Sequence, residues 1–245
     1  MFLGKYFMKF KFSVFILFII ISVDLNAQNI ELPSYVDLLQ YKNYDLPKFR
    51  IWGWSRDGKM AYSRELWRDD TDTCYNICFY IFDFINDENI LTINIDTDKE
   101  NSVILAYIAN LESIRKTMEY YKIIENERQI DLLQFPIRKN NILYESKVTW
   151  VSAGYHTHFN EDTGEWWSME FDEYYNVDII ISRNNQTKII NTYKGITPGG
   201  IGYSIEVGGY LLSPFENRAL IFIFHGSMNL DNYDLSGCHL DIGFR

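Results

Sequence analysis

Residues 51–63 read Ile-Trp-Gly-Trp-Ser-Arg-Asp-Gly-Lys-Met-Ala-Tyr-Ser. Aromatic and branched side chains stand on both sides of Asp57-Gly58, a pair that supplies the positive φ of a tight hairpin turn. A second run of β-prone residues follows, interrupted by the turn-forming residues 86–89. The chain therefore predicts two successive hairpins, with strands at 51–55, 60–63, 77–84 and 90–95.

A long helix is predicted after these hairpins. Thr97-Asp98-Lys99-Glu100 has the spacing of a capping box, in which a threonine and a glutamate three residues later cap the start of a helix. Charged residues such as Glu112 and Lys116 occupy one face, so we expect a helix over about 98–124 to lie half exposed on a sheet. Apolar residues recur at steps of three and four along the other face: Ile104, Tyr107, Leu111, Ile114, Met118 and Tyr121.

The rest of the chain predicts strands. One short helical turn is expected over 34–40, capped by Ser34. No Gly/Ser linker or shift in composition divides residues 28–245, so we predict one domain. It is expected to be mainly β with one long amphipathic helix and antiparallel sheets, propeller-like or sandwich-like in arrangement. The further strands are expected at 142–152, 166–182, 188–193, 203–212 and 219–224, with a hairpin turn at 184–186.

The first hairpin resembles a known repeat. Residues 54–62, Trp-Ser-Arg-Asp-Gly-Lys-Met-Ala-Tyr, followed by residues 80–84, Tyr-Ile-Phe-Asp-Phe, resemble the inner hairpin and next strand of a TolB-like β-propeller blade. Residues 212–221, Leu-Ser-Pro-Phe-Glu-Asn-Arg-Ala-Leu-Ile, look like a degenerate second copy with a longer turn. Blades recur about every 40 to 45 residues, a period that does not link these two copies. A propeller closes by pairing its first and last segments, so the resemblance implies that residues 51–63 and 210–224 are neighbours in space.

The first 27 residues predict export. Lys5, Lys9 and Lys11 precede an apolar run over 12–23, and a small residue, Ala27, follows. This is the order of a secretory signal peptide cleaved after that alanine. An uncleaved N-terminal anchor is the alternative, although about a dozen apolar residues are few for a membrane span. We therefore predict a periplasmic or extracellular protein with no stable membrane span after cleavage.

The net charge limits the classes of partner, and the positions of the cysteines limit which disulfides can form. The chain has 23 Lys plus Arg and 33 Asp plus Glu, a formal net charge of -10, so its surface should repel nucleic acid. An envelope protein or a glycan is the expected partner. Cys74 and Cys78 are too far apart to bridge if they share a strand, so either Cys238 forms a disulfide with one of them or all three thiols are reduced.

The candidate metal-binding, catalytic and ligand-binding residues lie within residues 156–178. In one strand His156 and His158 would face the same metal ion, but no recognised spacing fixes a third ligand, and surface histidines beside a turn are the alternative. Carboxylates paired beside tryptophan are typical of glycosidase and sugar-binding grooves. The alternative is an ordinary half-buried strand with Trp167, Met169 and Phe171 on its inner face. The candidates are His156 and His158 for metal, Glu165, Glu170 and Asp172 for catalysis, and Trp166, Trp167 and Tyr174 for binding.

The remaining motifs carry less chemistry. Residues 69–72, Asp-Asp-Thr-Asp, could hold calcium but lack the glycine and closing glutamate of an EF-hand loop. Residues 199–202 are glycine-rich and predict a turn. Neither a nucleophile elbow nor a phosphate or dinucleotide loop occurs, so no cofactor is expected.

The leading hypothesis is an exported non-enzymatic envelope or binding module that displays a β surface. The alternative is a periplasmic or secreted hydrolase, glycoside-type or metal-assisted, that uses residues 156–178.

Overall fold

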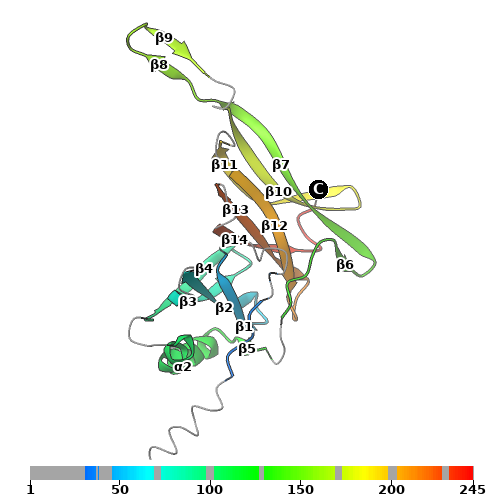
Figure 1. Ribbon diagram of the computed structural model, residues 1–245. Coiled ribbons are helices and arrows are strands. Elements are labelled where there is room, and N and C mark those ends of the chain that lie inside the picture. Colours follow the sequence, from blue (N-terminus) through cyan, green and yellow to red (C-terminus); the bar gives the residue numbers. More distant parts are fainter. Residues whose placement is uncertain are drawn as a thin grey trace, which may run out of the picture.

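In the part of the chain that the structure describes, antiparallel sheets are stacked and one helix lies on the outside (Figure 1). The computed structural model describes residues 31–36, 38, 46–68, 73–97, 102–126, 130–168, 173–197, 203–227 and 232–244. The expected signal peptide, the acidic residues 69–72 and the glycine-rich residues 199–202 lie outside these ranges. Over these described ranges, the prediction of a mainly β fold with antiparallel sheets and one long helix is confirmed.

The two predicted hairpins form the first sheet, which has the strand order β4-β3-β2-β1-β5. Its strands are β1 (Lys48–Trp54), β2 (Lys59–Arg68), β3 (Thr73–Asp83), β4 (Glu88–Ile95) and β5 (Ile124–Glu125). Gly58 has the positive φ, +83°, that the first turn was expected to need. The buried Ser55 closes the same turn, because its Oγ accepts a hydrogen bond from Lys59 N at 2.8 Å.

The predicted helix is α2 (Val103–Tyr120), and it packs on the face of this sheet that carries Trp52, Phe79 and Ile81. Four of the expected apolar residues are buried in this contact, namely Tyr107, Leu111, Ile114 and Met118. Ile104 was expected on the same face but is exposed. The helix therefore covers the sheet from Ala106 to Met118, while Ile104 and Leu105 face solvent.

Both predicted helix ends are wrong. The helix starts after Ser102, and Thr97, the first residue of the expected capping box, bonds instead through its hydroxyl to Tyr75 O at 3.2 Å. Residues 98–100 of that box lie outside the described ranges. At the other end, Ile124 leaves the helix to pair with β1 as strand β5. Gly53 allows this pairing, since a Cβ there would lie 2.2 Å from Ile124 O.

Two more sheets complete the stack. The middle sheet contains β12 (Tyr203–Leu212), β13 (Arg218–Ser227) and β14 (Asn232–His239) in that order. The outer sheet has the order β11-β10-β7-β6, formed by β6 (Ile137–Lys139), β7 (Ile142–Tyr155), β10 (Glu173–Arg183) and β11 (Gln186–Ile196). A separate hairpin pairs β8 (His158–Asn160) with β9 (Glu165–Trp167).

Several local predictions are resolved by these elements. Asn184 and Asn185 both have positive φ, as the predicted turn between β10 and β11 requires. The expected continuous strand over 166–182 is wrong, because β9 ends at Trp167 and β10 begins at Glu173. The helical turn expected over 34–40 is wrong at its start, since Tyr35 forms an isolated antiparallel bridge with Arg50, and residues 37, 39 and 40 lie outside the described ranges. Strand β14 had no counterpart among the sequence-based predictions.

The middle sheet is buried on both faces. Leu220, Phe222 and Phe224 of β13 point into a core shared with the first sheet. Ala219, Ile221 and Ile223 alternate with them and point into a core shared with the outer sheet. An unbroken apolar run in a strand is the pattern expected when both faces are covered. The order of layers is therefore α2, first sheet, middle sheet and outer sheet.

The predicted proximity of residues 51–63 and 210–224 is confirmed. Trp54, Met60 and Tyr62 share one core cluster with Leu211 and Leu220. The two segments meet by packing face to face from different sheets, not by pairing within one sheet.

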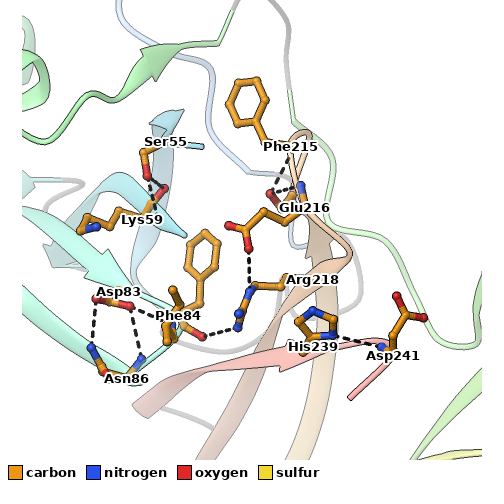
Figure 2. Close-up of polar contacts among 12 residues, drawn as sticks. Ser55, Lys59, Asp83, Phe84, Asn86, Phe215, Glu216, Arg218, His239 and Asp241 are labelled. Carbon is orange, nitrogen blue, oxygen red and sulfur yellow. Dashed lines mark hydrogen bonds and ion pairs between the residues drawn. The ribbon is translucent and has the colours of Figure 1, made fainter. Parts of the chain in front are cut away.

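The two turns of these segments also contact each other. The guanidinium of Arg56 lies 5.3 Å from the centre of the Phe215 ring. Figure 2 shows the second turn, where Arg218 Nε donates to Glu216 Oε2 at 2.8 Å and Arg218 Nη1 donates to Phe84 O at 3.5 Å.

The cysteines remain unpaired. Cys74 and Cys78 both lie in β3, and these two thiols and Cys238 are free. The alternative of three reduced thiols therefore describes the structure. In the described part of the chain no helix has the length and apolar character needed to cross a bilayer.

The helix contact gives a stability prediction. Leu111→Ala removes a buried side chain from the face of α2 that packs on the first sheet, so it should lower the free energy of unfolding by about 2 to 5 kcal/mol. Glu112→Ala on the exposed face removes only an ion pair with Lys116 and should change it by less than about 0.5 kcal/mol. Urea unfolding followed by circular dichroism measures both. Equal small losses would show that the helix does not depend on this contact.

Candidate functional site

The outer sheet carries an arm that ends in an exposed hairpin. Strands β7 and β10 pair from Ser182↔Glu145 out to Glu173↔Tyr155, and β8 and β9 lie beyond that end. Figure 1 shows the β8–β9 hairpin at the end of the molecule opposite α2. We call residues 148–182 the arm and residues 155–167 the aromatic tip.

The turn of the aromatic tip is well defined. The side chain of Asn160 accepts hydrogen bonds from the backbone N–H groups of Asp162 and Thr163 at 2.9 and 3.3 Å. The backbone closes between Gly164 N and Asn160 O at 2.8 Å, and Gly164 has the positive φ of +69° that this closure requires. The turn of the tip is therefore closed by hydrogen bonds within the tip itself.

Aromatic side chains pair across the two short strands. The rings of His158 and Trp167 stack with centres 4.6 Å apart, and those of Phe159 and Trp166 lie 5.0 Å apart. Each pair comprises directly opposed residues of the register, so the pairs lie on opposite faces of the hairpin. All four side chains face solvent, and Trp166 is 68% exposed, Trp167 42% and Phe159 49%. The hairpin thus presents an aromatic surface on both sides.

The predicted histidine pair is not brought together as expected. β7 ends at Tyr155 and β8 begins at His158, so the prediction that His156 and His158 alternate along one strand is wrong. The His156 ring packs on Tyr174 with centres 5.0 Å apart, whereas His158 stacks on Trp167. Among the described residues no group of three His, Cys, Asp or Glu side chains is arranged to hold a metal ion.

The other predicted site residues divide into two groups. Trp166, Trp167 and Glu165 lie exposed on β9 within the aromatic tip, and Tyr174 lies half-buried at its base. Glu170 and Asp172 lie outside the described residues. Phe159 was not among the predicted site residues. The turn-forming residues Asn160 and Gly164 were the available signal, because they mark a hairpin that places Phe159 opposite Trp166.

A polar cluster joins β11, the strand beside the arm, to the middle sheet. Tyr193 of β11 donates a hydrogen bond to Asp234 Oδ2 of β14 at 2.6 Å, and His225 Nε2 of β13 lies 3.3 Å from the same oxygen. The hydroxyl of Tyr203 completes the cluster at 2.7 Å from His225 Nδ1. Hydrogen bonds from His225 and then from Tyr193 hold the pKa of Asp234 below its usual value. These residues come from four different strands, so no local sequence motif predicts the cluster.

A second carboxylate is fully buried and accepts hydrogen bonds from side chains around it. Glu65 accepts hydrogen bonds from Tyr35 at 2.5 Å, from Arg50 Nε at 2.8 Å and from Tyr107 at 3.0 Å. Burial, reinforced by the charge of Glu65, raises the pKa of the Tyr107 phenol well above its usual value. Since protein groups occupy the carboxylate from several sides, this network joins residue 35, the first sheet and α2, and offers no open position to a ligand.

Two shallow hollows lie near β5, away from the predicted site residues. One of about 540 Å³ is lined by Arg56, Asp57, Glu119, Lys122, Ile123 and Ile124. The other, of about 490 Å³, is lined by Trp54, Ile124, Glu125, Asn126, Ile130, Leu212, Pro214 and Phe215. Neither lining includes a histidine or any residue of the arm. These two hollows are therefore separate from the aromatic tip.

In comparisons with known proteins, no protein-family model, no curated protein and no solved structure matches the chain.

The polar cluster that joins β11 to the middle sheet gives a pH-dependent prediction. The pKa of Asp234 is lower in the folded chain, so its carboxylate stabilises the fold above the unfolded pKa of about 3.9, and this contribution is lost as the pH falls through the folded pKa. Asp234→Asn should lower the free energy of unfolding by roughly 1 kcal/mol at pH 7, after allowance for partial exposure, and by much less near pH 2.

Urea unfolding at the two pH values measures this difference. Asp162→Asn, an acid-to-amide change on the exposed turn of the tip, is the control and should have little effect at either pH. A loss for Asp234→Asn that is the same at pH 7 and pH 2 would show that the carboxylate charge does not stabilise the fold.

Proposed function

We propose that the protein is an exported, non-enzymatic binding module and that the aromatic tip is its contact surface. One observation carries the proposal: a hairpin at the end of the arm exposes Phe159, Trp166 and Trp167 to solvent. Clustered exposed aromatic residues on a folded protein mark sites of interaction. The export part of the proposal rests on the pattern of residues 1–27.

The geometry of the aromatic tip favours binding. A buried tryptophan contributes about 150–250 Å² of contact area, which corresponds to several kcal/mol. The Asn160 turn and the two cross-strand ring pairs hold these side chains in place before a partner arrives. Less conformational entropy is then lost on association, which raises the affinity that a small surface can reach.

The hydrolase alternative has less support. Glu165, His156 and His158 are exposed on the arm, whereas a hydrolase needs its acid and base to converge in a concave site. The two hollows near β5 contain none of these three side chains. No specific contact among the described residues favours catalysis over binding at the tip.

Export has a direct test. Intact-mass analysis of the protein purified from its native host should give a chain that starts near Gln28, because cleavage is expected after Ala27. A full-length chain recovered in the membrane fraction would contradict cleavage and would favour an N-terminal anchor.

The contact surface is tested by immobilising the protein and measuring what it captures from an envelope extract. Trp166→Ala/Trp167→Ala should reduce capture of its bound component about tenfold or more, since tryptophans dominate the energetics of many interfaces. Tyr120→Ala removes an exposed aromatic side chain from α2, at the opposite end of the molecule, and should leave capture unchanged. Undiminished capture by the double variant, with an unchanged circular dichroism spectrum, would rule out the tip as the contact surface.

A further inference from the structure

The charge of the arm is entirely of one sign. Residues 148–182 contain no Lys or Arg, and the flanking basic residues are Lys147 and Arg183. The segment contributes -7 of the formal charge of -10, which leaves -3 for the rest of the chain. Its acidic residues are Glu161, Asp162, Glu165, Glu170, Asp172, Glu173 and Asp178.

Three of these acids lie on the aromatic tip itself. Glu161 and Asp162 belong to its turn and Glu165 begins β9, and all three are exposed. None takes part in an ion pair among the described residues. Their charges are therefore available to a partner that meets the neighbouring rings.

The rings of the tip also differ from those of the body of the protein. Elsewhere cations cover aromatic faces: Lys48 Nζ lies 3.7 Å from the centre of a Trp67 ring, and Arg183 lies 4.4 Å from that of Phe244. The Lys and Arg side chains in these contacts lie over rings outside the aromatic tip, where the ring partner of Trp167 is His158 and that of Trp166 is Phe159. Since the arm contains no Lys or Arg and Trp166 is 68% exposed, this ring is open to a cation supplied by a partner.

We propose that the partner of the aromatic tip is a basic polypeptide surface, whose Lys and Arg side chains lie on the exposed rings and pair with the carboxylates of the turn. This inference rests on the proposed function and identifies the chemistry of its partner. Charge complementarity selects the occupant, because the field of the arm repels nucleic acid, anionic lipid and acidic polysaccharide. A neutral glycan would use the rings but gain nothing from the carboxylates, and a second copy brings its own net charge of -10.

The test measures binding of a labelled 20-residue peptide of repeated Arg-Gly-Leu-Lys by fluorescence anisotropy between 25 and 250 mM NaCl. The variant Glu161→Gln/Asp162→Asn/Glu165→Gln removes three charges from the tip. The matched control, Glu88→Gln/Glu112→Gln/Glu119→Gln, removes three charges from exposed positions on β4 and α2. Both variants change the net charge equally, so any difference between them reports the position of the charge.

The tip variant should weaken peptide binding about tenfold at 25 mM NaCl and flatten its dependence on salt, whereas the matched control should change it less than about threefold. Trp166→Ala should weaken binding at every salt concentration, because the ring contact is less screened than the ion pairs. Equal losses for the two charge variants would overturn the proposal. Equal affinity for a peptide of repeated Glu-Gly-Leu-Glu would also overturn it.

The other occupants are distinguished in the same series. Binding of chitohexaose that is lost in Trp166→Ala would overturn the proposal in favour of a neutral glycan if the basic peptide does not bind. Sedimentation of the wild-type chain as a dimer that the same substitution disrupts would overturn it in favour of a second copy. If the tryptophan variants lose capture from the envelope extract while the charge variant does not, the tip remains the contact surface and only the basic partner is excluded.

Discussion

The double burial of β13 is the constraint on which the rest of the structure depends. Alternate residues of Ala219–Phe224 enter two different cores, one shared with the first sheet and one with the outer sheet. A strand of this kind has no face for solvent, so the fold exists only when both neighbouring sheets are in place. The first sheet in turn presents its other face to α2. Hydrophobic burial therefore couples all four layers through one strand.

This layering explains why the arm can project. The inner residues Val177, Ile179 and Ile181 of β10 are anchored in the core next to the middle sheet, and the same strand continues outward to Glu173. The hydrogen bond between Tyr193 and Asp234 joins the outer sheet to the middle sheet at the side of the arm. The inner ends of β7 and β10 are therefore fixed in the stack of sheets, and the β8–β9 hairpin lies beyond their outer ends.

Local patterns predicted much of this fold, and tertiary contacts account for what they missed. Asp57-Gly58 and the spacing of Tyr107 and Leu111 specify a turn and a helix face from a few adjacent residues. The end of α2 depends on a contact between residues far apart in the sequence, because Ile124 pairs with β1 beside Gly53. At the candidate site, alternation predicted Trp167 on an inner face, but no core lies behind a two-stranded hairpin, so the same residue is exposed.

The contrast between the aromatic residues of the body and those of the tip is the strongest argument that the arm has a separate role. Phe49 and Phe222 meet edge to face across the two sheets with centres 5.5 Å apart, and both are fully buried. Phe159 and Trp166 form an equally close pair that buries neither ring. Exposed rings contribute little to the stability of the fold. A surface that combines them with unpaired carboxylates is suited to a partner, and the core does not need it.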